Sequence, residues 1–318
     1  MSATASAMTS SRTPPNLAPA CAVPTFIDTP RCVWAAGAAL GEGTLWSERH
    51  QALYWVDILG HQLHRYHPGT LTRDSWAFNE EVSTVAERAN APELIIALRR
   101  GLAYFNTETS TLQPLHQPEP ERTGNRFNDG KCDAQGRFWV GSMDFDCQAP
   151  TGALYRCTAD GQCNRVADGY AVSNGPTWSH DGRTLYFNDT VQSRTYAFDF
   201  DPVAGTVSNR RVWREWAAVD GFPDGMTTDA QGRLWIAHWG AACVTCHDPL
   251  SGTELARVTL PTRHITNCAF GGTDLTTLFI SSARTGLSAE QLIAEPLAGG
   301  LFCVTVDSPG LLPNFFAG

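Results

Sequence analysis

Two eight-residue stretches of the chain are near copies: Asp133-Ala-Gln-Gly-Arg-Phe-Trp-Val140 and Asp229-Ala-Gln-Gly-Arg-Leu-Trp-Ile236. Each is a turn followed by a short run of aromatic and β-branched residues, which is typical of a β-strand. Weaker versions of the same pattern bring the number of such segments to six, at residues 52–56, 93–97, 137–141, 184–188, 233–237 and 277–281. Corresponding residues of successive segments are 41 to 49 residues apart.

This spacing decides the fold class. A period of about 40–50 residues with several strand-like runs in each period is typical of a β-propeller blade. Further strand-like runs, at residues 194–200 and 211–213 for example, fill the space between the segments and are separated by turns. We therefore predict an all-β, six-bladed β-propeller over residues 31–318, in which residues 33–40 complete the last blade. A pair of β-sandwiches is the alternative, but it gives no reason for six spaced copies.

The composition excludes several classes of protein. Charged residues make up 17% of the chain and hydrophobic residues 42%, which excludes a charge-rich disordered protein. Lys and Arg number 23 against 32 Asp and Glu, so the net charge is −9. An acidic chain without a basic block is a poor ligand for nucleic acid or an anionic membrane. No apolar run reaches the roughly 18 residues of a membrane-spanning helix.

Residues 1–30 are rich in Ser, Thr, Ala and Pro and have neither the basic start nor the apolar core of an export signal. We expect them to form a disordered tail. Without an export signal the expected location is the cytoplasm, where the ten cysteines would be reduced. A closed ring of blades leaves no long sheet edge exposed, so a monomer is expected.

A set of polar residues recurs at one position of the period. The innermost strands of propeller blades surround a central channel, and the loops that enter them converge at one mouth. Ten or 11 residues before the repeated anchor position, the chain carries Glu42, Ser83, Asn128, Asn174, Asp224 and Asn267. All but Ser83 offer a carboxylate or amide oxygen, the donor that hard cations prefer. Asn and Asp also favour turns, but a glutamate between two glycines is not explained in that way.

At these residues the chain resembles the family of senescence marker protein, gluconolactonase and luciferin-regenerating enzyme, which includes regucalcins and bacterial sugar lactonases. The matching motifs are Leu40-Gly-Glu-Gly-Thr-Leu-Trp46, Asn125-Arg-Phe-Asn-Asp-Gly-Lys131, Gly136-Arg-Phe-Trp-Val-Gly-Ser-Met143, Ser173-Asn-Gly-Pro176, Pro223-Asp-Gly-Met226 and Ala283-Arg-Thr-Gly-Leu287. They occur in the family's order. Thr44 departs from the pattern, because a proline is common there.

The resemblance implies a six-bladed propeller with one divalent metal ion in its channel. It assigns the metal ligands to Glu42, Asn174 and Asp224, and Asp224 is also the expected general base. The identity of the metal stays open, because oxygen ligands accept Ca²⁺, Mg²⁺, Mn²⁺, Zn²⁺ or Fe²⁺.

The resemblance also implies the reaction, which is hydrolysis of a sugar lactone to its aldonic acid by a metal-activated water. It assigns substrate contacts to Arg126, Asn128 and, in a short divergent loop, Asp146. The lactones of L-arabinonic, D-xylonic, D-galactonic and D-gluconic acid all remain open as substrates.

Other functions compete with this one. The chain has neither the Gly-x-Ser-x-Gly motif of a serine hydrolase nor a His-Glu-x-x-His motif. A phosphotriesterase-like hydrolase and a calcium-binding propeller without catalysis stay open. Cys243 and Cys246 form half of a zinc motif without a second pair, so we interpret them as structural thiols. His61, His64 and His67 are three residues apart, a spacing that puts neighbours on opposite faces of a strand.

Overall fold

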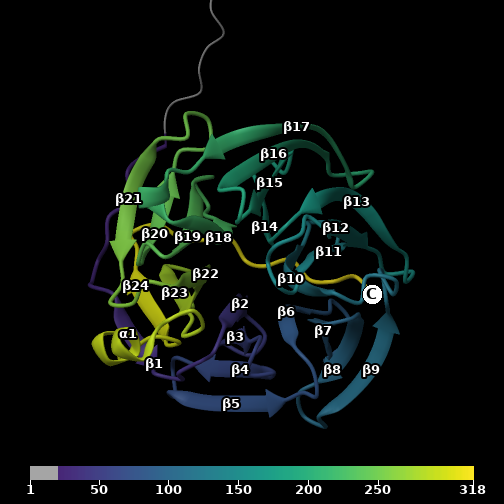
Figure 1. Ribbon diagram of the computed structural model, residues 1–318, viewed down its shortest axis with the longest axis horizontal. Helices are drawn as coiled ribbons and strands as arrows, with labels where there is room; N and C mark the ends of the chain where they lie inside the picture. Colours follow the sequence, from purple (N-terminus) through teal and green to yellow (C-terminus); the bar gives the residue numbers. More distant parts are fainter. Residues whose placement is uncertain (1–20) are drawn as a thin grey trace, which may run out of the picture.

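The computed structural model describes residues 21–318 and places six four-stranded sheets in a ring (Figure 1). Neighbouring strands within each sheet run antiparallel, and the first strand of each repeat lies nearest the centre. The predicted all-β, six-bladed propeller is therefore confirmed. The repeated segments of the sequence form the second strand of each blade, at β3, β7, β11, β15, β19 and β23.

The first three blades each use four consecutive strands, ordered from the centre outward. Blade 1 contains β2 (Gly41–Ser47), β3 (Ala52–Asp57), β4 (Gln62–His67) and β5 (Thr72–Ala77). Blade 2 contains β6 (Val82–Glu87), β7 (Leu94–Leu98), β8 (Leu102–Asn106) and β9 (Thr111–His116). Blade 3 contains β10 (Asn125–Cys132), β11 (Phe138–Asp144), β12 (Gly152–Cys157) and β13 (Cys163–Tyr170).

The last three blades complete the ring in the same order. Blade 4 contains β14 (Ser173–Trp178), β15 (Thr184–Asp189), β16 (Arg194–Asp201) and β17 (Thr206–Glu215). Blade 5 contains β18 (Phe222–Thr228), β19 (Leu234–Trp239), β20 (Cys243–His247) and β21 (Glu254–Thr259). Blade 6 contains β22 (Ile265–Gly271), β23 (Thr277–Ser282), β24 (Leu301–Thr305) and β1 (Arg31–Trp34). Its outer strand comes from the start of the described chain, as predicted, but only Val33 and Trp34 of the predicted segment 33–40 belong to it. Two short helices, η1 (Ala218–Asp220) and α1 (Ala289–Ala294), lie in loops.

The two near-copied stretches fold in the same way. The Asp229 carboxylate accepts hydrogen bonds from the Arg233 Nε at 2.6 Å and the Trp235 Nε1 at 2.8 Å, and also from backbone N–H groups of its own turn. Asp133 makes the same bonds to Arg137 and Trp139. The carboxylate thus ties the turn to the strand that follows, which explains why Asp, Gly, Arg and Trp recur together.

Apolar side chains fill the spaces between blades. Trp55, Trp139 and Trp235 are fully buried on second strands of three different blades. The Trp139 ring meets Phe200 edge to face, with the ring centroids 5.5 Å apart. Burial of one such large side chain stabilises the fold by roughly 1.5–3 kcal/mol. Packing of this kind holds the innermost strands, and hence the channel residues, in fixed positions.

The start of the described chain differs from the prediction. Phe26 pairs with Val306 and meets the Trp235 ring edge to face, at a centroid distance of 6.3 Å. The Asp28 carboxylate accepts hydrogen bonds from the backbone and side chain of Thr305. The disordered tail expected over residues 1–30 is therefore wrong for residues 21–30, because strands from the other end of the chain bind them. Residues 1–20 lie outside the described residues.

The end of the chain crosses the ring, as the yellow trace in Figure 1 shows. Gly310 pairs with Asp229 of blade 5, and the Ala317 N–H donates to the Gly136 carbonyl of blade 3. A cavity of about 320 Å³ is lined by Leu311 and Pro313 of this segment and by Thr44 and Lys131 of the innermost strands. The C-terminal segment therefore covers one end of the channel. No helix within residues 21–318 is long and apolar enough to cross a membrane.

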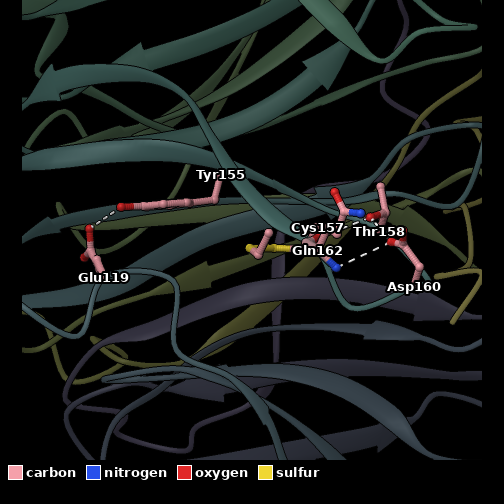
Figure 2. The surroundings of a disulfide bond; sticks show 7 residues. Glu119, Tyr155, Cys157, Thr158, Asp160 and Gln162 are labelled. Carbon is pink, nitrogen blue, oxygen red and sulfur yellow. Dashed lines mark hydrogen bonds between the residues drawn. A yellow bond between two sulfur atoms is a disulfide. The ribbon is translucent and has the colours of Figure 1, made fainter.

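Two of the ten cysteines form a disulfide, which corrects the expectation that all thiols are reduced. Cys157 and Cys163 lie opposite each other on β12 and β13, and Figure 2 shows the bond beside the hairpin of Thr158, Asp160 and Gln162. The pairing follows from the hairpin register, which the sequence spacing alone does not reveal.

The disulfide is directly testable. Alkylation of the unfolded protein without reductant should label eight cysteines and spare Cys157 and Cys163. Mass spectrometry of the peptides would measure this, and labelling after reduction is the control. Full labelling of Cys157 before reduction would contradict the pairing.

Candidate metal-binding and catalytic site

The six polar positions converge on the innermost strands, not in the loops before them as predicted. Each is the second to fourth residue of its strand. The strand pairing is irregular at all six positions; in blade 1, for example, the register shifts between Glu42 and Leu45. A β-bulge bends a strand and redirects its side chains. Bulges at equivalent places therefore account for the convergence of residues from all six blades.

Three carboxyl groups are buried together in this part of the channel. Glu42, Asp129 and Asp224 are each no more than 5% exposed. Burial and the nearby Asp129 charge raise the pKa of Glu42 to about 8. Burial, followed by the charges of Glu42 and Asp129, raises the pKa of Asp224 well above its usual value. The three groups strongly disfavour being ionised together unless a cation lies between them.

Asp129 is the residue that sequence reasoning missed. Its carboxylate accepts hydrogen bonds from the Gly130 and Gly175 backbone N–H groups and from the Asn267 Nδ2 at 3.2 Å. Burial raises its pKa, and the Lys131 charge opposes that shift. The only signal in the sequence is an aspartate directly beside a position of the polar ring, in a setting that is equally typical of a turn.

Each amide oxygen of the ring already accepts one hydrogen bond from a neighbouring side chain. The Asn128 Oδ1 accepts from the Arg126 Nη1 at 2.6 Å, and the Asn267 Oδ1 accepts from the Thr44 hydroxyl at 2.8 Å. Asn267 turns its NH₂ toward Glu42 and Asp129, so it is a donor to the carboxylates. The Asn174 Oδ1 likewise accepts one bond, from the Asn128 Nδ2, so these bonds do not separate Asn174 from the other two amides, and its assignment as a ligand rests on the family resemblance.

The predicted substrate contacts separate into two groups. Arg126 is buried and donates to Asn128, whose Nδ2 donates to the Asn174 Oδ1 at 2.9 Å, so these three residues form one chain. Asp146 is exposed on the loop after β11 and is not part of that chain.

The other sequence candidates lie outside the channel cluster. Cys243 and Cys246 are buried, free thiols of β20, as their structural interpretation requires. His64 packs against Trp34 and Trp55 and bonds to Ser75 through its Nδ1. Within residues 21–318 no three His, Cys, Asp or Glu side chains are arranged to hold a metal ion. The set Glu42, Asn174 and Asp224 has only two such side chains, because its third donor is an amide.

These three residues fit a hard divalent cation on chemical grounds. Their donor atoms are all oxygens, two of them on carboxylates that repel each other when ionised. The 320 Å³ cavity is lined further along the same innermost strands, by Thr44, Lys131 and Thr177. The chemistry of the donor set, and not the size of that cavity, identifies the candidate site.

Known proteins resemble this chain over most of its length. Residues 40–284 match the family model described as SMP-30/Gluconolactonase/LRE-like region. The chain is 36% identical over 281 residues to the putative sugar lactone lactonase YvrE of Bacillus subtilis (strain 168), which covers 88% of this chain and 96% of that protein. It is 35% identical over 292 residues to the regucalcin of Danio rerio, and the match covers 90% of this chain and 98% of that protein. The crystal structure of a calcium-binding protein, regucalcin, from Agrobacterium tumefaciens superimposes on this chain with a TM-score of 0.86 at 26% identity. The match covers 94% of this chain and 98% of that one.

Proposed function

This chain belongs to the SMP-30/gluconolactonase/LRE-like family, and from that membership we propose that it is a metal-dependent lactonase that hydrolyses a sugar aldonolactone to the aldonic acid. The observation that supports the proposal is the burial of Glu42, Asn174 and Asp224 on innermost strands, where the Glu42 charge raises the pKa of Asp224 and hydrogen bonds lead from Arg126 through Asn128 to Asn174. A relative described as a sugar lactone lactonase supports the reaction class. A relative described as calcium-binding supports a divalent cation.

Glu42, Asn174 and Asp224 would hold the metal ion. When bound, a divalent cation supplies Lewis acidity and lowers the pKa of a coordinated water. The two carboxylates bring negative charge that retains the cation. The neutral amide of Asn174 adds a ligand without further reducing the positive charge.

Asp224, Arg126 and Asn128 each have a different role in the hydrolysis. Asp224 takes a proton from the attacking water as the water oxygen bonds to the lactone carbonyl carbon. The bond from that carbon to the ring oxygen breaks, and the proton passes to the ring oxygen, which leaves as a hydroxyl group. The Arg126 guanidinium stabilises the negative charge that develops on the carbonyl oxygen, and Asn128 holds the guanidinium in place.

The substrate is a polyhydroxylated lactone in this proposal, with Asp146 as a further hydroxyl contact from its exposed loop. The L-arabinono-, D-xylono-, D-galactono- and D-gluconolactones are the candidates. We also propose that the enzyme acts as a cytoplasmic monomer. A calcium-binding propeller without catalysis is the second candidate, because the oxygen donors of Glu42, Asn174 and Asp224 also suit simple cation binding.

Proton release from a panel of aldonolactones in weak buffer tests the function. Metal-stripped protein should give only the spontaneous rate, and refilling with one of Ca²⁺, Mg²⁺, Mn²⁺, Zn²⁺ or Fe²⁺ should restore rapid release of acid from at least one lactone. Ser83→Ala is the matched control, because Ser83 holds the equivalent ring position in blade 2 and its hydroxyl bonds only to the Ala97 carbonyl. Tight cation binding without acid release from any lactone would instead favour the binding propeller or another ester hydrolase.

A further inference from the structure

Thr190 follows β15 at the junction of blades 4 and 5, and its hydroxyl contacts both blades. The Thr190 Oγ1 lies 2.8 Å from the Asn174 Nδ2 and 2.8 Å from the Pro223 carbonyl oxygen. Asn174 is a proposed metal ligand of blade 4, and Pro223 directly precedes Asp224 of blade 5. One hydroxyl group therefore bonds to one proposed ligand and to the residue directly before another.

The directions of these bonds follow from their chemistry. A backbone carbonyl can only accept, so the single Thr190 hydroxyl proton goes to Pro223. The Thr190 oxygen is then left as an acceptor, and the Asn174 group that faces it must be the NH₂. The Asn174 Oδ1 is consequently turned the other way, toward Asn128. Thr190 thus fixes the orientation of this amide from its NH₂ end.

The same logic holds at the other end of the chain of bonds. The Asn128 Nδ2 donates to the Ser173 carbonyl, which also can only accept, so the Asn128 amide has one possible orientation. The bonds then run in a single direction from Arg126 through Asn128, Asn174 and Thr190 to Pro223. The Asn174 Oδ1 uses one lone pair for Asn128 and keeps the second for a cation.

We propose that Thr190 is a positioning residue that presents the oxygen of Asn174 to the metal ion and holds the Asp224 segment against it. Asn188 supports the same segment, because its Nδ2 donates to the Asp224 carbonyl at 2.6 Å. The inference rests on the proposed function, since it concerns the orientation of two residues assigned there as ligands. Thr190 itself does not touch the substrate or the metal.

Thr190→Val removes the hydroxyl but keeps the shape of the side chain. The Asn174 amide then loses one of the two bonds that fix its orientation and keeps only the bond that its Oδ1 accepts from Asn128, so the orientation that presents NH₂ to the cation becomes easier to reach. The apparent affinity for Ca²⁺ or Mn²⁺ should fall by about 10- to 100-fold, as is usual when a residue that orients a metal ligand is removed. Thr190→Ser keeps the hydroxyl and should restore the affinity.

Thr228→Val is the matched control. The Thr228 hydroxyl donates to the Trp178 carbonyl at 2.8 Å and so joins the same two blades, but at the opposite end of β14 and β18. A general loosening of the blade junction would affect both valine variants alike. The positioning role requires that Thr190→Val weakens cation binding and Thr228→Val does not.

Two measurements test the proposal. Titration calorimetry of EDTA-stripped protein with CaCl₂ and with MnCl₂ gives the cation affinity. The side-chain amide signal of Asn174 in the metal-free protein, assigned through Asn174→Asp, gives its protection from hydrogen exchange. Protection should be lost in Thr190→Val and retained in Thr190→Ser and Thr228→Val.

The outcomes separate the inference from the proposed function. Equal cation affinity and equal amide protection in Thr190→Val and the wild-type protein would overturn the inference. Loss of affinity in Thr228→Val as large as in Thr190→Val would do the same. If the wild-type protein binds neither cation but Thr190→Val still loses amide protection, the proposed function fails while the orienting role of Thr190 stands.

Discussion

Asp224→Asn is expected to lower lactone turnover by roughly 1,000-fold or more, because the change removes the proposed general base and a charged metal ligand together. Asparagine has nearly the same shape, so the buried site keeps its packing. Turnover would be measured by acid release on the preferred lactone, at saturating concentrations of the metal that restores the wild-type enzyme. Retained turnover with normal metal content would contradict the role of Asp224.

The same substitution should stabilise the metal-free protein. Asp224 is crowded by the carboxyl groups of Glu42 and Asp129, so removing one acidic group relieves repulsion that must otherwise be offset by protonation or a bound cation. In urea denaturation with EDTA, the midpoint of Asp224→Asn should lie above that of the wild-type protein. Adding the metal should raise the wild-type midpoint and leave that of the variant unchanged.

Asp129→Asn distinguishes loss of charge from loss of a ligand. Asp129 belongs to the same cluster, but its oxygens already accept bonds from Gly130, Gly175 and Asn267. We expect its replacement to weaken cation binding by less than about tenfold, through charge alone. A loss as complete as that of Asp224→Asn would show that total charge, and not the ligand set, governs the site.

The sequence revealed the blades because the fold repeats a local structure. Asp133 and Asp229 each anchor an arginine and a tryptophan of their own blade, so the contacts that stabilise the repeat lie within a few residues and leave a visible pattern. Residues 21–30 left no such pattern. Phe26 and Asp28 bind strands almost 280 residues further along the chain, and composition alone made the segment look disordered.

Register explains why the polar positions could be grouped from the sequence and why Asp129 was missed. Equivalent positions of a propeller converge, so the six polar positions could be grouped from their spacing, and the family resemblance then selected Glu42, Asn174 and Asp224 among them. Successive residues of a regular strand point to opposite faces, which argues against using both Asn128 and Asp129. The register shift between Phe127 and Gly130 suspends that alternation, and both side chains reach the buried cluster. The exact place of a bulge, like the Thr190 contact across blades, depends on packing that a single sequence does not display.

Asp229→Ala is expected to destabilise the protein by about 3–5 kcal/mol, because it leaves the Arg233 guanidinium charged and without its partner in the interior. The Arg233 side chain is 1% exposed, whereas the equivalent Arg137 is 11% exposed. Water can therefore solvate Arg137 in part. Asp133→Ala should accordingly lower the free energy of unfolding by less than Asp229→Ala does. Urea denaturation of the two variants at one metal concentration would measure the difference. Equal losses of stability would mean that the destabilisation comes from the lost hydrogen bonds of the turn and not from the unpaired arginine charge.

A double variant separates these two causes. Arg233→Met in the Asp229→Ala background removes the unpaired charge and keeps much of the volume of the side chain, so it should recover part of the lost stability. Recovery stays partial because the Trp235 indole N–H and the turn N–H groups still lack the Asp229 carboxylate. If Arg233→Met restores nothing, the carboxylate acts mainly as a cap for its turn. The near-copied stretches would then be explained by turn formation, with the arginine as a secondary partner.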